Sequence, residues 1–200
     1  MPSRGDRGGA ATRARIADVA TGMFLERGFE DVTIAEVAAA AGVSKVTVFA
    51  HFDRKEDLLL DRLPGAVDLV RSAIRDRPDG VGPVEAIRRM VVRLADEKHV
   101  LSGLGDGVEP FLRMVVASPA LIARLRVFEH QIERVLADEL AADSRFDGDA
   151  DLTAALIVAG YRNAATSTMR RRLAGDAPAA LEAAHGAALT AAFAALADGL

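Results

Sequence analysis

Apolar residues recur at every third or fourth position along most of the chain, which is the period of an amphipathic α-helix. The first apolar set predicts a helix that starts near Thr12 and ends at Gly28; it consists of Ile16, Val19, Ala20, Met23 and Phe24. No segment shows the strict alternation of a half-buried strand. The chain is therefore predicted to be all-α, with about nine helices.

Two short helices are expected next. Thr33 and Glu36 have the spacing of a capping box and predict the start of a helix over residues 34–41. Gly42 suits the tight turn that follows, and Ser44 is a preferred residue at the start of a third helix. Two helices joined by a glycine turn have the dimensions of a helix-turn-helix, although any helical hairpin shares that outline.

A fourth helix is expected over residues 54–76. Asp53 and Glu56 predict a second capping box at its start. Pro64 lies inside this helix, and a proline there removes a backbone hydrogen bond and clashes with the preceding turn. A kink or a break is therefore expected at Pro64 and Gly65, with a possible role as a hinge.

The rest of the chain predicts five further helices. These helices are expected over residues 83–99, 108–117, 118–142, 151–173 and 176–198. Ser118-Pro119 starts the third of them directly after the second, and the other boundaries are loops or turns that contain glycine, proline or aspartate. Residues 1–11 contain glycine and arginine without an apolar period, so a flexible arm is expected there.

The composition narrows the class of protein. Half of the residues are hydrophobic and 27% are charged, as in globular proteins. The absence of cysteine excludes disulfides and thiolate metal sites, and it fits a reducing cytoplasm. No apolar run of membrane-spanning length and no signal peptide are expected. The net charge of −4 argues against indiscriminate coating of nucleic acid, but a local DNA-binding face remains compatible with it.

Residues 25–59, LERGFEDVTIAEVAAAAGVSKVTVFAHFDRKEDLL, resemble the N-terminal DNA-binding domain of the TetR family of bacterial repressors. The matched pieces are Gly28-Phe29, 33–38, 41–44, 47–49, His51-Phe52 and 55–58. The resemblance implies a TetR-like fold: a three-helix head over residues 12–57 and a helical bundle over residues 58–200 that binds a ligand and dimerises. It also implies a cytoplasmic regulator, most often a repressor. Such a regulator binds a palindromic operator as a homodimer and is released by a small lipophilic effector.

The resemblance places DNA contacts on Thr33, Ser44, Lys45, Val46, Thr47, Phe49, His51 and Lys55. Lys45 matches a position that often reads a base edge, and Val46 a variable position that can touch a thymine methyl. Thr47 matches a frequent phosphate or base contact, and His51 and Lys55 match phosphate contacts. Phe49 stands where the family most often has a tyrosine whose hydroxyl bonds a phosphate, so only ring packing remains. Independently of DNA, Thr33 and Ser44 act as helix caps, and Phe49 suits a core position equally well.

Acidic and basic residues nearly balance in residues 1–60, so the head is not strongly basic. DNA binding then requires that the acids lie on another face or at helix N-termini. Arg4, Arg7 and Arg13 could reach the minor groove or flanking phosphates, with a solvated tail as the alternative.

The resemblance also indicates a ligand pocket and a dimer interface in the larger domain. Pocket candidates are the apolar or orienting residues Met90, Leu94, Phe111, Met114, Phe128, Gln131, Ile157 and Tyr161, although such a stripe also suits an ordinary core. Interface candidates are the mainly small residues Ala155, Ala159, Ala188, Ala192 and Phe193. The alternative to a dimer is a monomeric bundle that buries these faces internally.

Catalysis is unsupported by the sequence. The G-x-G at Gly103–Gly105 follows no strand, and Glu129-His130 with Glu133 lacks the spacing of a metal-binding pair. No metal, cofactor or enzyme activity is therefore expected. The alternative function is an all-α ligand-binding or interaction module without specific DNA binding.

Overall fold

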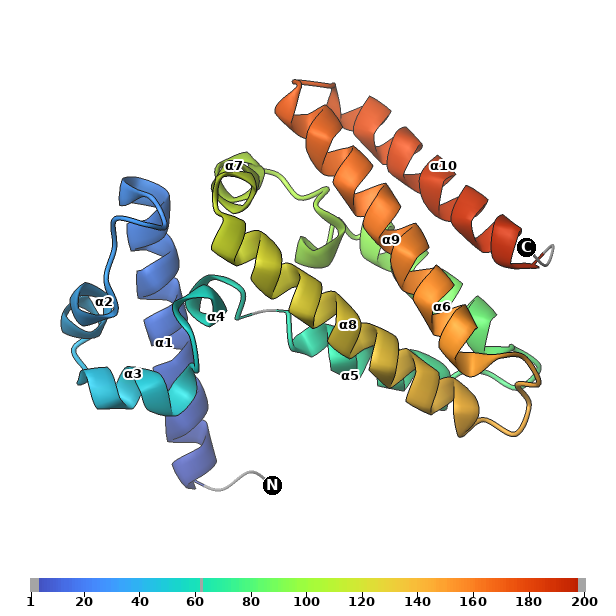
Figure 1. Cartoon of the computed structure of the whole chain (residues 1–200), viewed down its shortest axis with the longest axis horizontal. Coiled ribbons are helices and arrows are strands. Elements are labelled where there is room, and N and C mark those ends of the chain that lie inside the picture. The colour runs from blue at the N-terminus through green and yellow to red at the C-terminus, as the bar shows by residue number, and fades with distance from the viewer. Residues whose placement is uncertain (1–3, 62, 198–200) are drawn as a thin grey trace. The chain divides into compact units, whose positions relative to one another are not determined.

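A computed structural model describes residues 4–61 and 63–197, with the backbone alone for residues 4–8. Every regular element in this part of the chain is helical (Figure 1). The helices are α1 (Arg4–Arg27), α2 (Ile34–Ala40), α3 (Lys45–His51), α4 (Lys55–Leu59), α5 (Gly65–Arg75), α6 (Pro83–Asp96), the 3₁₀ helix η1 (Val100–Ser102), α7 (Glu109–Ala117), α8 (Pro119–Ala141), α9 (Ala150–Leu173) and α10 (Pro178–Ala197). The predicted all-α class is confirmed, and the described residues hold ten α-helices.

The chain forms two compact units. The first consists of Met1–Arg62 together with Arg113–Arg124, and the second of Leu63–Leu112 with Leu125–Leu200. In the first unit α1 packs against α2, α3 and α4, and its apolar side buries Ile16, Ala20 and Phe24. The core of this unit also contains Phe29, Val32, Val37, Ala38, Val48, Phe52 and Leu58.

The first unit departs from the predictions at two places. Helix α1 begins at Arg4 rather than near Thr12, so it overlaps the expected arm; residues 1–3 of that arm lie outside the described part. The capping box of Asp53 and Glu56 is wrong, because Arg54 is the N-cap of α4 and makes no side-chain capping bond. A capping motif is a short pattern that occurs by chance, and the backbone after α3 turns one residue later than the motif requires.

The helix predicted over residues 54–76 is interrupted, as the proline implied. Helix α4 ends at Leu59, and α5 begins at Gly65 with Pro64 as its N-cap residue. Proline suits the start of a helix, where the missing N–H has no intrahelical partner in any case.

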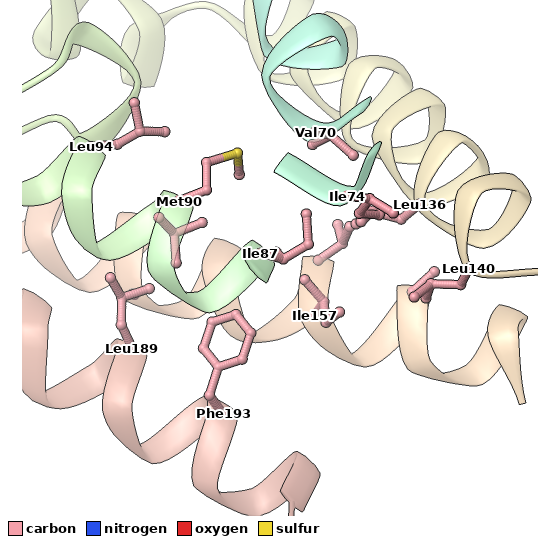
Figure 2. Packing of buried hydrophobic residues seen from close by; sticks show 14 residues of the cluster. Val70, Ile74, Ile87, Met90, Leu94, Leu136, Leu140, Ile157, Leu189 and Phe193 are labelled. Atoms are coloured by element: carbon pink, nitrogen blue, oxygen red, sulfur yellow. The ribbon is translucent and has the colours of Figure 1, made fainter. Parts of the chain in front are cut away.

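The core of the second unit joins five helices. Apolar residues from α5, α6, α8, α9 and α10 meet in one cluster, including Ile74, Ile87, Leu136, Ile157 and Leu189 (Figure 2). Burial of each such side chain stabilises the fold by about 1.5–3 kcal/mol relative to exposure. A nearly buried ion pair between Arg77 and Asp143 lies at the edge of this unit.

Helices α9 and α10 run side by side and approach closely (Figure 1). A Cβ placed on Gly160 would lie 2.7 Å from the Cβ of Ala192, which is closer than carbon atoms pack. Buried Thr168 of α9 donates its hydroxyl hydrogen to the Ala164 carbonyl, and its oxygen lies 2.8 Å from Nδ1 of buried His185. The Thr168 hydroxyl therefore accepts from His185, whose Nδ1 carries the proton.

The loop after α6 is fastened to α9 and α10 by three side chains. Lys98 pairs with Glu182 of α10 at 2.8 Å. From α9, the Tyr161 hydroxyl donates to the Leu101 carbonyl at 2.7 Å, and Arg172 donates to the Leu104 carbonyl at 2.9 Å. The bonds from Tyr161 and Arg172 satisfy backbone carbonyl groups between α6 and α7, where the only regular element is the short 3₁₀ helix η1.

Candidate nucleic-acid interface

Helix α3 is only seven residues long and depends on its flanking contacts. Ser44 caps its start, since the Ser44 hydroxyl accepts from the Thr47 backbone N–H at 3.0 Å and lies 2.9 Å from the Thr47 hydroxyl. Gly42 provides the preceding turn with a φ of +65°, a conformation that favours glycine. Val48 faces inward and is fully buried. The predicted cap and turn are both confirmed.

The outer face of α3 is open to solvent. Val46 is 78% exposed and Phe49 is 54% exposed, three positions apart on one side of the helix. Lys45 and Ser44 are also exposed, and Thr47 is half-buried. Phe49 therefore does not belong to the core, which was one of its two predicted roles. Exposed apolar residues beside a lysine form a surface that can contact both bases and phosphates.

The other predicted DNA-contact residues lie around α3 with contacts of their own. Thr33 is exposed at the start of α2, and His51 is half-buried at the end of α3. Lys55 lies over aromatic rings, with Nζ 4.4 Å from the centre of the Phe29 ring, and it donates to the Glu30 carbonyl at 3.4 Å. Its ammonium group is thus already attracted to the protein by a cation–π contact.

The capping box at α2 is complete. The Thr33 hydroxyl accepts from the Glu36 N–H, while the Thr33 backbone N–H donates to the Glu36 carboxylate at 2.8 Å. Hydrogen bonds from the hydroxyl and the backbone of Thr33, aided by Arg27, lower the pKa of Glu36 to about 2. Glu36 therefore stays ionised at every physiological pH and keeps the start of α2 fixed.

Acidic residues of the first unit are engaged away from α3. Glu30 accepts from the buried Ser118 hydroxyl at 2.8 Å, and Asp57 pairs with Arg124 at 2.6 Å. Both partners come from Arg113–Arg124, the distant part of the chain that belongs to this unit. These pairings engage two of the acidic side chains of the nearly neutral first unit with partners outside α3.

Sequence reasoning missed three attachments in the first unit. These are the Ser118–Glu30 and Arg124–Asp57 contacts, and a set of bonds around Arg13, for which a solvated tail or a contact with DNA was considered. Arg13 Nε donates to Asp61 at 2.7 Å, and Nη1 donates to the His51 carbonyl. Partners that lie 38 to 88 positions apart leave no local pattern in the sequence.

The predicted pocket residues divide between both units. Met90, Leu94 and Ile157 are buried in the core of the second unit, and Tyr161 packs against it. Of the others, Phe111 and Phe128 of the second unit and Met114 of the first are half-buried, and Gln131 is exposed. Burial raises the pKa of Tyr161 to about 12, and its hydroxyl hydrogen already bonds the Leu101 carbonyl. A ligand would find that hydroxyl available as an acceptor only.

A hollow of about 660 Å³ lies elsewhere in the second unit. It is lined by Pro83, Val84 and Glu85 of α6 and by Thr190, Phe193 and Leu196 of α10, among others. Within this set, Phe193 was predicted from the sequence as a dimer-interface residue.

The predicted dimer-interface residues lie on α9 and α10. Ala155, Ala159, Ala188 and Ala192 are half-buried, and Phe193 is 7% exposed within the core. The small size of Ala192 is used inside the chain, where it faces Gly160. The side of α10 away from α9 carries exposed residues, most of them alanine.

By length and composition alone, α10 is apolar enough to cross a membrane, with a mean hydropathy of 1.4; α2 and α3 pass the same test only if taken as one bent pair. This differs from the sequence-based expectation, because alanine dominates α10 and few polar residues interrupt it. Only 22% of the apolar window of α10 is buried inside the chain.

Comparison with known proteins identifies the same region. Residues 16–61 match the family model described as "Bacterial regulatory proteins, tetR family". The chain is 33% identical over 137 residues to the HTH-type transcriptional repressor LfrR of Mycolicibacterium smegmatis, covering 68% of this chain and 70% of LfrR. It is 29% identical over 156 residues to the HTH-type transcriptional regulator TcmR of Streptomyces glaucescens, covering 76% of this chain and 68% of TcmR. Several further relatives are matched over half of their own length or less.

Structural similarity to TetR-family proteins covers nearly the whole chain. The crystal structure of Thermus thermophilus FadR, a TetR-family repressor in complex with lauroyl-CoA, superposes with a TM-score of 0.60, covering 94% of each chain at 23% identity. The family model and the matched relatives agree, so the chain belongs to the TetR family of bacterial transcriptional regulators, which are not enzymes.

Proposed function

We propose that this regulator represses transcription as a homodimer on an inverted-repeat operator and is released by a small lipophilic effector. In this proposal residues 12–57 bind DNA, and residues 58–200 bind the effector and dimerise. The protein acts in the cytoplasm, where its DNA lies, and uses neither a membrane nor a metal.

The exposed face of α3 carries the proposal. Val48 is buried, whereas the side chains of Val46 and Phe49 are open to solvent. Exposure of these two apolar side chains does not stabilise the fold. A helix in the major groove uses such residues for contact with thymine methyl groups, while Lys45 donates to guanine O6 or N7. Thr33, Thr47, His51 and Lys55 then supply contacts to phosphates, which set the register.

The exposed side of α10 supports a dimer. This helix is apolar over most of its length, but only 22% of its apolar window is buried by its own chain. A second copy related by a two-fold axis would cover it and would present two α3 helices to successive turns of one DNA face. The hollow between α6 and α10 adjoins this side, since exposed Thr190 and Ala194 line it.

A lipophilic effector is supported by the apolar character of the second unit. Met90 and Leu94 belong to a cluster with few polar atoms, and methionine adapts readily to different apolar ligands. The fold relative FadR binds lauroyl-CoA, which has a long apolar chain. We therefore assign the effector to the same chemical class.

The test is binding to a palindromic fragment from beside the protein's own gene. Affinity should fall steeply with salt, and Lys45→Ala should weaken binding and lower the slope of log K against log salt by about 0.9 for each of the two subunits, or about 1.8 per homodimer. Lys55→Ala should have a smaller effect on the slope, because its ammonium group already contacts Phe29. Adding lauroyl-CoA, with lauric acid as a second probe, should release the operator.

The alternative of an all-α ligand-binding or interaction module predicts a different result. In that case neither Lys45→Ala nor Lys55→Ala changes the binding of DNA, and the palindromic fragment binds no better than a scrambled one. A monomer by sedimentation at micromolar concentration would contradict the homodimer.

A further inference from the structure

The end of α3 has an unusual partner on α1. Helix α3 ends at His51, and the last carbonyl groups of any helix lack intrahelical donors. Arg13 of α1, 38 positions earlier in the chain, donates from Nη1 to the His51 carbonyl. A positive charge at this end of a helix is also favoured by the helix dipole.

The same guanidinium makes two further contacts. Its carbon lies 4.3 Å from the centre of the Phe52 ring, the residue directly after α3, and its Nε donates to Asp61 at 2.7 Å. The ion pair is partly shielded, with side-chain exposures of 38% for Arg13 and 22% for Asp61. One planar group therefore connects α1, the end of α3 and the segment after α4.

These contacts require arginine. The fork of a guanidinium can donate to the carbonyl and the carboxylate at once while its flat face stacks on a ring. A lysine would keep the charge but place a single ammonium group, which cannot make all three contacts together. The two hydrogen bonds use one N–H on Nε and one on Nη1, and they direct these donors toward the protein.

We infer that Arg13 is a positioning residue for operator recognition: it fixes the direction of α3 from behind and links it to Asp61, without contacting DNA. The inference rests on the proposed DNA-binding function. It assigns to Arg13 a role opposite to that of a flanking phosphate contact, because its charge is used inside the head.

The experiment compares full-length wild type with Arg13→Gln, Arg13→Lys and Asp61→Asn. Operator affinity is measured across a series of salt concentrations, with the active fraction determined by stoichiometric titration. Arg13→Gln should weaken operator binding roughly tenfold while the slope of log K against log salt stays unchanged and non-specific binding stays nearly constant. Arg13→Lys should recover only part of this loss, and Asp61→Asn should show a smaller loss of the same kind.

Two controls separate charge from position. Arg15→Gln removes the same charge from an exposed position on α1, so it measures the general effect of a lost cation. Lys45→Ala shows the fall in slope that a direct DNA contact produces. If Arg13→Gln does not yield folded protein, the comparison of Arg13→Lys with Asp61→Asn decides, since each retains part of the network.

Two results would overturn the inference. A salt slope lowered by about 1.8 per homodimer, with equal losses on specific and non-specific DNA, would make Arg13 a phosphate contact. A lower melting temperature with unchanged affinity per active molecule, or full recovery by Arg13→Lys, would leave it a structural residue only. Failure of the wild type itself to prefer the palindrome would instead reject the proposed function.

Discussion

Helices α3 and α10 differ in length, in composition and in what stabilises them. Helix α3 has seven residues and is too short to be stable alone, so a cap, a turn and an arginine on another helix hold it. Helix α10 has 20 residues, most of them good helix formers, and needs little help to form. The difference shows where sequence is informative. A helix that depends on its surroundings carries its contacts in distinctive residues, whereas a helix of alanines does not reveal which side packs.

The largest effect on stability is expected where α10 packs against α9, and this contact tests which side of α10 faces its own chain. Gly160→Ala places a Cβ 2.7 Å from that of Ala192, so we expect the free energy of unfolding to fall by about 1–3 kcal/mol. Gly186→Ala in α10 is the matched control, since nothing lies within 4 Å of its added Cβ. That control should stabilise the protein by up to about 1 kcal/mol through helix propensity.

Urea denaturation followed by circular dichroism measures both variants. If Gly160→Ala were as stable as Gly186→Ala, then α9 and α10 would not pack as closely as described, and Ala192 would be free for another role.

A smaller effect is expected at the start of α3. Ser44→Ala removes the acceptor of the Thr47 N–H and should cost about 1 kcal/mol. Ser144→Ala, in an exposed loop, should change stability by less than about 0.5 kcal/mol. Thermal unfolding of both variants checks this, and equal melting temperatures would mean that α3 does not depend on its cap.

The smallest expected change in the free energy of unfolding at neutral pH concerns His185. This change grows as the pH falls. Burial lowers the pKa of His185 below its ordinary value of 6.5, so the native state holds it neutral. As pH falls below about 6.5 the unfolded chain binds a proton that the folded chain resists, and stability decreases. Above that pH the contribution is fully present.

The free energy of unfolding, measured between about pH 5 and 8, tests this pH dependence, because histidine titrates in that range. His185→Gln should flatten the dependence, whereas His130→Gln, at an exposed position, should retain it. An unchanged dependence in His185→Gln would assign the effect to another group.

Much of the head was predictable because its signals are local. The capping box of Thr33 and Glu36, the cap at Ser44 and the turn at Gly42 each lie within a few residues. Where a local pattern had no support from packing, as at Asp53, the prediction was wrong.

The contacts of Arg13 were not predictable, since they join residues brought together only by the fold. On α9 and α10, helical periodicity alone left open whether a small residue such as Ala192 faces its own chain or a partner. The roles assigned to the DNA-contact, pocket and interface residues remain predictions.

The return of Arg113–Arg124 to the first unit has a consequence for engineering. In this segment the Ser118 hydroxyl donates to Glu30, and Arg124 pairs with Asp57. A head that ends at residue 62 would leave both carboxylates without these partners. A chimera that joins this helix-turn-helix unit to a different C-terminal domain should therefore carry two pieces of sequence, residues 1–62 and residues 113–124. A single crossover near Pro64 would transfer only the first of them.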